Sequence, residues 1–468
     1  MQLLEKGTNR YILPARGDMK TPALFYLHKN FLAAAAADNS IEQLAQAATL
    51  PGTVAALGMP DIHSGFGLPI GGVLVGHAKE GLISAGAVGM DINCGVRLLR
   101  TGLQKEMLGR KELRALITRI EEAIPAGVGK KSSLKEISGL NRREVLAGGA
   151  EAAVKEGFGD TDDLIYCEEG GKYPGADPDK ISPRAYERSH QLGTIGGGNH
   201  FIEIGLVKEV YEEKTAALFG LAKGDITVMV HTGSRGLGHQ ICTDYSSLMF
   251  KQAKAFNLKL PSKGLAAVPA GSREGRDYLA AMSCAINFAF ANRQIISHYI
   301  RQVLLELFQE ARVRLIYDVA HNIAKFEEVE GEEYLIHRKG ATRALPPGHP
   351  QNPDRYTHTG HPAIIPGTMG TSSYVVVGTP LIAETYNSVN HGAGRTMSRT
   401  KAKNTFSAAD ISRQLDDVLL SARDQGAVID EAPLAYKNIH DVVDTLADIG
   451  LTKKIAQLKP LAVIKGVG

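Results

Sequence analysis

The segment I-T-V-M-V-H-T-G-S-R-G, residues 226–236, sets the pattern from which the fold can be predicted. Its first five residues indicate a short strand, which ends at His231 in a turn of small and polar residues. A histidine at such a boundary is held rigidly by the strand and stays accessible. The segment therefore combines a strand with a candidate ligand.

Other strand-like segments show the same relation to polar turns. His200 precedes one of them, and His321 follows another. The turn D-I-N-C-G, residues 91–95, precedes a third. These further predicted strands are residues 86–90, 96–99, 201–204, 313–319, 374–377 and 461–464.

Helical patterns alternate with these strands. Residues 110–124 have the apolar spacing of an amphipathic helix, and residues 277–308 predict one long or two abutting helices, mostly buried. Two more helices are expected near the C-terminus. Residues 337–367 are predicted to form loops, and we expect Asp61 and His63 to lie in a turn.

This alternation predicts an α/β or mixed α+β fold, with central β-sheets flanked by helices and the metal and nucleotide site at the strand ends. If the strand ends form one site, the chain cannot be divided into independent domains. We therefore expect residues 1–468 to form a single domain. Residues 125–184, rich in glycine and charge, predict a surface insertion with one or two short helices.

Bulk properties limit the class of protein. A net charge of +3 with 22% charged residues does not indicate a nucleic-acid binder, so any such site must be a local patch. The start M-Q-L-L-E-K-G lacks a signal-peptide pattern, and residues 279–292 are too few and too polar to span a bilayer. The four cysteines have no framework spacing, which indicates a reduced, cytoplasmic protein.

Five residues in these turns and strand ends carry side chains that bind transition metals: Asp91, Cys94, His200, His231 and His321. One carboxylate, one thiolate and three imidazoles suffice for one or two ions, and a bridging thiolate would let two ions share Cys94. The donors suit zinc, manganese, iron or cobalt. Each residue alone is more often structural, Cys94 for example as a small buried hydrophobe, but five in matching contexts favour a metal site.

A sixth histidine lies in the segment N-S-V-N-H-G-A-G-R-T-M-S-R-T-K-A-K, residues 387–403. Small residues flank His391 and leave its imidazole open, and no acid occurs between Glu384 and Asp410. The pattern indicates a reactive or ligating histidine beside an anion site. A glycine turn before a solvated basic helix is the alternative interpretation.

Two common nucleotide motifs are absent. The chain has no G-x-x-x-x-G-K-[ST] sequence, which argues against a P-loop NTPase, and no K-x-D-G lysine-nucleophile motif. If the protein activates a nucleotide covalently, another residue must attack. Histidine is a competent nucleophile.

Nine blocks, taken in order over nearly the whole chain, resemble the RtcB family of GTP-dependent RNA ligases. The blocks are M-P-D-I-H-S-G-F-G-L-P-I-G-G (59–72), G-M-D-I-N-C-G-V-R (89–97), G-G-G-N-H-F-I-E (196–203), H-T-G-S-R-G-L-G-H-Q (231–240), D-V-A-H-N (318–322), H-R-K-G-A-T-R-A (337–344), P-G-T-M-G-T-S-S-Y (366–374), N-H-G-A-G-R (390–395) and V-I-K-G (463–466). Departures are small, such as Thr232 and the glycine run before Asn199.

The resemblance implies a role for each matching residue. His391 matches the histidine that attacks GTP to form a histidine–GMP intermediate, and the five candidate ligands match the ligands of two Mn²⁺ ions, with Cys94 shared. The positions that match the guanylate pocket are Asn199, His200, Phe201, Glu203, Ser372, His391, Ala393, Gly394, Tyr436 and Lys465. Candidates for RNA phosphates are Arg188, Arg235, Arg395 and Arg399, and Asp61 is expected to assist near the metals.

The implied substrates are RNA 3′-phosphate or 2′,3′-cyclic phosphate ends and 5′-hydroxyl ends, in tRNA splicing or RNA repair. The resemblance also implies archease as an activating partner, and we expect a monomer or weak dimer away from membranes. Two alternatives remain open. A metal-dependent phosphoesterase would need the metal ligands but not His391, and a non-catalytic RNA-binding relative would need neither His391 nor Cys94.

Overall fold

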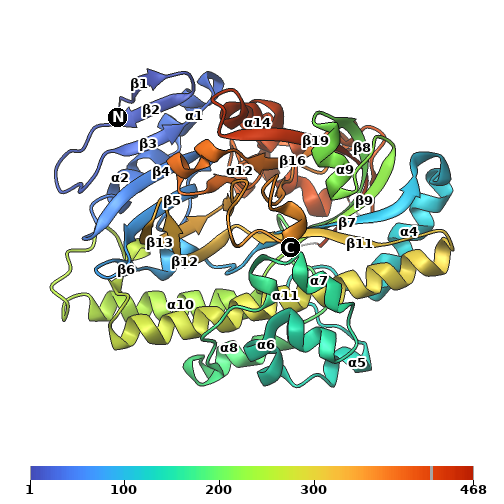
Figure 1. Cartoon of the computed structure of the whole chain (residues 1–468), viewed down its shortest axis with the longest axis horizontal. Helices are drawn as coiled ribbons and strands as arrows, with labels where there is room; N and C mark the ends of the chain where they lie inside the picture. Colours follow the sequence, from blue (N-terminus) through green and yellow to red (C-terminus); the bar gives the residue numbers. More distant parts are fainter. Residues whose placement is uncertain (1, 422–424, 467–468) are drawn as a thin grey trace.

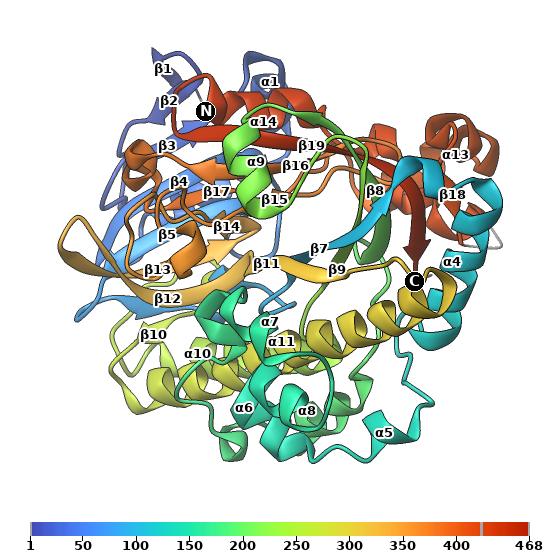
Figure 2. The same cartoon turned by 45° about the vertical axis from the view of Figure 1, so that its right-hand side comes forward.

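Two large sheets, flanked by helices, form the core of the protein, so the predicted mixed α/β architecture is confirmed (Figures 1 and 2). The computed structural model describes residues 2–421 and 425–466. The seven-stranded sheet has the order β1 (Leu4–Gly7), β2 (Arg10–Leu13), β3 (Ala23–Tyr26), β4 (Thr53–His63), β5 (Ile70–His77), β13 (Glu332–Lys339) and β12 (Asn322–Val329).

The second large sheet contains the strands expected to carry the site. Its order is β11 (Arg314–Ala320), β7 (Gly95–Gln104), β9 (Asp225–Thr232), β8 (Phe201–Val210), β19 (Thr452–Lys465), β16 (Ser373–Gly378) and β15 (Ala363–Ile365), with β18 (Leu419–Leu420) beside β19. Two short pairs complete the strands: β6 (Leu82–Ile83) with β10 (Val268–Pro269), and β14 (Ala341–Arg343) with β17 (Ser388–Asn390).

The helices pack mainly outside these sheets. They are α1 (Leu32–Ala37), α2 (Ser40–Ala47), α3 (Ala85–Val88), α4 (Arg110–Ala123), α5 (Lys135–Ser138), α6 (Arg142–Lys155), α7 (Thr161–Ile165), α8 (Pro183–Arg188), α9 (Glu213–Phe219), α10 (Arg235–Gln252), α11 (Arg273–Leu307), α12 (Arg399–Thr405), α13 (Ala408–Leu415) and α14 (Ile439–Ala447). No helix within the described part of the chain has the length and apolar character needed to cross a membrane.

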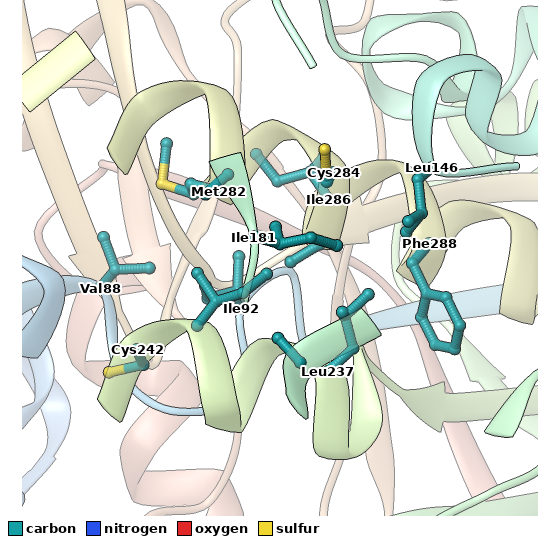
Figure 3. Close-up of a cluster of buried hydrophobic side chains, with 14 of the residues drawn as sticks. Val88, Ile92, Leu146, Ile181, Leu237, Cys242, Met282, Cys284, Ile286 and Phe288 are labelled. Carbon is teal, nitrogen blue, oxygen red and sulfur yellow. The ribbon is translucent and has the colours of Figure 1, made fainter. Parts of the chain in front are cut away.

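Helix α11 is one continuous helix of 35 residues and runs beneath the sheets for most of the width of the molecule (Figure 1). Its interior positions are buried on nearly all sides, as the apolar sequence predicts. Figure 3 shows Met282, Ile286 and Phe288 of α11 in one apolar cluster with Leu237 of α10 and Leu146 of α6. The helix thus connects the layer of α6, α8 and α10 to the sheets above it.

Antiparallel pairing brings the predicted site residues to one edge of a sheet. In β9, His231 lies opposite Val96 of β7 and Phe201 of β8, while Ala320 at the end of β11 lies opposite Gly95 at the start of β7. Because neighbouring strands run in opposite directions, the starts of β7 and β8 lie beside the ends of β9 and β11. The residues gathered at this edge are Cys94, His200, His231 and His321.

Some local predictions were wrong. Residues 86–90 are not a strand, because small residues allow the short buried helix α3 to form there. Asp61 and His63 lie at the end of β4 and not in a turn. His337 and Arg338 belong to β13 and not to a loop, because Glu327 of β12 pairs with Arg338 and makes its burial possible.

Residues 125–184 contain α5 to α7, the start of α8, and several turns. Helix α6 packs against α11, and Leu146 and Ala150 lie in the apolar core. Further along, Glu168 is buried and accepts a 2.7 Å hydrogen bond from Lys325 of β12. The segment is therefore attached to the rest of the protein by apolar packing and by a buried ion pair.

Asp318, in β11, neutralises two buried arginines. Its carboxylate accepts a 2.7 Å hydrogen bond from Arg97 Nε and bonds of 2.9 and 3.0 Å from Arg293 Nε. All three side chains are fully buried. The carboxylate is therefore the counter-charge that allows both cations to lie inside the protein.

Replacing Asp318 by asparagine should destabilise the fold by about 3–5 kcal/mol, because two buried cations lose their counter-charge. Urea unfolding followed by circular dichroism measures the change. The matched control is Asp18→Asn, which removes an ion pair with Lys259 at the surface and should have little effect. Equal midpoints for the two variants would contradict the assigned role of Asp318.

Candidate metal centre and active site

The five predicted metal ligands lie together at the sheet edge. Cys94 Sγ lies 3.3 Å from His200 Nε2 and 3.4 Å from His231 Nε2. His200 Nε2 is 2.7 Å from Asp91 Oδ2, and His231 Nε2 is 3.4 Å from His321 Nε2. One nitrogen of each imidazole thus points toward the same small volume.

The side chains form two overlapping groups of three, and within each group the potential ligand atoms lie within 4.8 Å of one another. One group is Cys94, His231 and His321, and the other is Asp91, Cys94 and His200. Because Cys94 belongs to both, two ions held by these groups would share its sulfur. Mixed sulfur, nitrogen and oxygen donors at this spacing fit transition-metal ions, and the identity of the ion stays a prediction.

The electrostatics of the cluster suit metal binding. Burial lowers the pKa of His231 and of His321, so both imidazoles are neutral and keep a lone pair for an ion. Burial raises the pKa of the Cys94 thiol, so a metal must displace its proton on binding. Burial alone would raise the pKa of Asp91, but the charge and hydrogen bond of His200 lower it to about 2.

Arg293 of α11 holds the backbone on both sides of this cluster. Its Nη1 donates 2.9 Å hydrogen bonds to the carbonyls of Asn93 and Thr232, the neighbours of Cys94 and His231. Asn322 adds a 3.0 Å bond from its amide to the Asp91 carbonyl. The ligands therefore have fixed positions before any ion binds.

His391 follows β17 and lies against this cluster, with its ring centroid 4.8 Å from that of His321. Its Nδ1 is 2.6 Å from Asp61 Oδ2, which also accepts hydrogen bonds from the backbone N–H groups of His391 and Gly392. Because a carboxylate oxygen accepts, Nδ1 carries the proton and Nε2 keeps its lone pair. Gly394 has a φ of +71°, and a Cβ there would lie 2.3 Å from the Asp61 carbonyl oxygen.

A cavity of about 850 Å³ joins His391 to the candidate metal ligands. Four of the five candidate ligands line it, and the fifth, Cys94, is buried in contact with two of them, His200 and His231. Most residues predicted for the guanylate pocket also line the cavity: Asn199, His200, Phe201, His391, Ala393, Gly394, Tyr436 and Lys465. The end of β19 brings Lys465 opposite Phe201 of β8, which places its ammonium over that ring at 5.6 Å.

Two predicted pocket residues do not line the cavity. Ser372 immediately precedes β16, and its Oγ accepts a 3.0 Å hydrogen bond from Gln457. Glu203 lies on the same face of β8 as Phe201 but is buried, and its Oε1 has no hydrogen-bond partner among the described residues. This burial raises the pKa of Glu203 to about 8.

Glu431 is a cavity residue that the sequence did not predict. Its carboxylate lies 3.3 Å from Arg395, 3.4 Å from Arg399 and 3.5 Å from Lys465, and it accepts a hydrogen bond from the Tyr436 hydroxyl. Burial would raise the pKa of Glu431, but the charges of Lys465 and the arginines lower it. The only signal in the sequence is an acid five residues before Tyr436.

The four predicted phosphate-binding arginines all line the cavity, but their side chains differ in the hydrogen-bond and ion-pair partners that hold them. Arg395 donates to Met397, Asp430 and Tyr436 as well as to Glu431, and Arg235 donates to Thr194 and the Gly127 carbonyl. Burial lowers the pKa of Arg235. Arg188 is exposed, and within the described chain it has no acidic partner.

Known proteins similar to this chain are RNA-processing ligases. The family model described as tRNA-splicing ligase RtcB matches residues 43–466. The tRNA-splicing ligase RtcB of Archaeoglobus fulgidus is 44% identical over 461 residues, which cover 96% of this chain and 95% of that protein. The protein of the same name from Thermococcus kodakarensis is 42% identical with equal coverage. RNA-splicing ligase RtcB homolog 1 of Entamoeba dispar is 43% identical over 91% of this chain and 82% of its own length.

Replacing Cys94 by alanine should weaken cobalt binding more than the roughly 10- to 100-fold typical of changes around a metal ligand, since both groups of three lose the same sulfur. Cobalt(II) titration followed by absorbance measures affinity, stoichiometry and the thiolate-to-cobalt band. Cys242→Ala is the matched control, because Cys242 is equally buried in α10. An unchanged band in Cys94→Ala would exclude this sulfur as a ligand.

Proposed function

This chain belongs to the RtcB family of tRNA-splicing ligases, an RNA ligase family, and on that premise we propose the route by which it joins RNA ends. GTP first guanylylates His391. The guanylate then passes to an RNA 3′-phosphate, and a 5′-hydroxyl end attacks the activated phosphate. The ligase reaction serves tRNA splicing or RNA repair.

The observation that carries this proposal is the contact between His391 and Asp61. With Nδ1 protonated and bound to Asp61, Nε2 supplies the lone pair that attacks the α-phosphorus of GTP. A P–N bond forms, the bond between the α-phosphorus and the bridging oxygen breaks, and pyrophosphate leaves. Asp61 keeps the ring oriented and stabilises the positive charge that it gains, as an acid does beside a catalytic histidine.

In each of the next two steps, a bond to phosphorus forms as another bond to that phosphorus breaks. An oxygen of the RNA 3′-phosphate attacks the guanylate phosphorus, and His391 leaves as a neutral imidazole. The 5′-hydroxyl oxygen then attacks the RNA phosphorus, loses its proton, and releases GMP. A 2′,3′-cyclic phosphate must first be opened by hydrolysis. Two Mn²⁺ ions held by the five candidate ligands would supply the positive charge that stabilises phosphate oxygens.

Guanine recognition is assigned to Glu203, which lies two residues from Phe201 on the same face of β8. Glu203 is buried outside the cavity lining, so this contact requires a local movement that exposes its carboxylate. Its Oε1 has no hydrogen-bond partner among the described residues, and the N1 and N2 hydrogens of guanine would supply two donors that adenine lacks in this arrangement. Lys465 and Tyr436 are expected to contact the guanylate. Ser372 lies outside the cavity lining, so its proposed contact requires a side-chain movement away from Gln457.

RNA phosphates are expected to bind the cations of the cavity, with marked salt dependence and little sequence preference. All four cysteines are buried free thiols, which supports a reducing compartment such as the cytoplasm. Archease as a partner, and a monomeric or weakly dimeric state, stay predictions from the family.

Incubation of the protein with α-labelled GTP and Mn²⁺ should give a covalently labelled chain, and His391→Ala should give none, because the attacking nitrogen is lost. Denaturing electrophoresis followed by acid and alkali treatment identifies the bond as a phosphoramidate, which is labile in acid and stable in alkali. The matched control is His349→Ala, which alters a histidine in a loop outside the cavity lining.

Cobalt binding by His391→Ala separates the loss of a nucleophile from the loss of the metal centre. Label in the His391→Ala chain would overturn the assignment of the nucleophile. Absence of label in the unmodified protein, with metal bound, would favour a metal-dependent phosphoesterase instead.

Asp61→Asn should slow guanylylation by about 100-fold or more, because asparagine keeps the shape of the carboxylate but not its charge or its preference for a protonated Nδ1. Single-turnover labelling at saturating GTP measures the rate. Metal affinity should remain within about twofold of the unmodified protein. A labelling rate equal to that of the unmodified chain would show that Asp61 does not orient the nucleophile.

A further inference from the structure

Exposed apolar side chains line the cavity, and none of the proposed steps uses them. Phe66, in the loop between β4 and β5, lines the cavity with 44% of its surface exposed. Met90 lines the same cavity with 39% exposed. The other cavity aromatics already have partners, since Lys465 lies over Phe201 and Arg395 over Tyr436. Among the described residues, Phe66 has no aromatic or cationic partner.

The loop that carries Phe66 is held at three successive residues. Ser64 N–H donates a 3.1 Å bond to Asp38, and the Gly65 N–H donates a 3.0 Å bond to the side chain of Gln43. The Gln43 amide donates back to the Gly65 carbonyl, and Lys339 donates to the carbonyl of Phe66 itself. An aromatic ring that is exposed on a fixed loop presents its face without a further ordering cost.

The backbone of Phe66 is connected to the reacting groups through Lys339. Lys339, which bonds Phe66, is followed by Gly340, where a Cβ would lie 3.0 Å from His391 Cε1. The side chain of Lys339 therefore spans the distance between the Phe66 backbone and Gly340, which lies beside the proposed nucleophile. Because His391 and Phe66 line the same cavity, a ligand bound at His391 can extend to Phe66.

Exposed cations line the same cavity. Arg184 and Arg188 are four residues apart on α8, so they project from the same face of that helix. Both are exposed, and neither pairs with an acid in the described chain. A fixed aromatic face with cations along one cavity matches the chemistry of a nucleic acid strand, in which bases stack and phosphates need positive charge.

We propose that Phe66 is the stacking platform for the terminal base of an RNA end, whose phosphates face Arg184 and Arg188. This inference rests on the proposed RNA ligase function and assigns a base-binding subsite to it. Stacking tolerates any base, so the platform recognises that a base is present and not which one. Either the 3′-phosphate end or the 5′-hydroxyl end supplies this base.

The test combines Phe66→Ala with RNA ends that lack the terminal base. Two substrates are made, one abasic at the 3′-phosphate nucleotide and one abasic at the 5′-hydroxyl nucleotide. KM and kcat for ligation are measured, with rates referred to the fraction of each protein that carries covalent GMP, and RNA binding is followed by fluorescence anisotropy. Phe326→Ala is the matched control, because Phe326 of β12 is 41% exposed and lies outside the cavity lining.

Phe66→Ala should weaken binding of normal RNA and raise its KM by about tenfold, and Phe66→Tyr should restore both. Removal of the base from one end should weaken binding to the unmodified protein by a similar factor and have no further effect on Phe66→Ala. The end that shows this loss identifies the stacked nucleotide. Phe326→Ala should behave as the unmodified protein.

Two results would overturn the platform while leaving the ligase intact. One is ligation by Phe66→Ala with unchanged KM, and the other is equal sensitivity of both proteins to base removal. A third result would support the platform and overturn the proposed function. In that case RNA binding depends on the terminal base and on Phe66, but the unmodified protein shows neither guanylylation nor ligation.

Discussion

The buried contact of Arg293 with Asp318 is the constraint on which the site depends. Arg293 extends from α11 and uses its Nε for Asp318 and its Nη1 for the carbonyls of Asn93 and Thr232. One guanidinium therefore joins the central helix to β11, to the turn that carries Cys94, and to the end of β9 that carries His231. Because Arg97 binds the same carboxylate, the position of β7 is fixed by the same charge. The geometry of the candidate ligands is a consequence of this network.

The second constraint joins the seven-stranded sheet to the loop that follows β17. Asp61 lies in the seven-stranded sheet, and His391 lies 330 residues later in the chain, after a strand of neither large sheet. Three hydrogen bonds reach one oxygen of Asp61, and Gly394 allows the His391 loop to approach the backbone of β4. The orientation of the proposed nucleophile thus depends on contacts from distant segments.

Sequence patterns predicted the parts of the site that local chemistry determines. Histidines at the ends of predicted strands, such as His231 and His321, indicated a common edge because strand ends in a sheet meet, and this placement is what the structure has. The pattern could not predict that Arg338 lies in a strand, because its burial depends on Glu327 in a neighbouring strand. Glu431 was missed for a similar reason. Its partners, Arg399 and Lys465, are 32 and 34 residues away, and nothing in its local sequence indicates them.

Glu431 shows how the cavity remains stable without an anion. Lys465 and Arg395 are both largely buried, and a buried cation without a counter-charge is strongly destabilising. Glu431 supplies that charge from within the chain. An anionic ligand that binds near Glu431 must compete with its carboxylate for Lys465 and Arg395. The affinity of that ligand therefore depends on how much more strongly these cations bind it than they bind Glu431. Among the described residues, the exposed arginines of α8 have no acidic partner, so a phosphate that binds there displaces no ion pair. If a base stacks on Phe66 as proposed, the two parts of the lining contribute differently to affinity, since an anion must replace an existing ion pair at Glu431 and only adds contacts at Phe66 and α8.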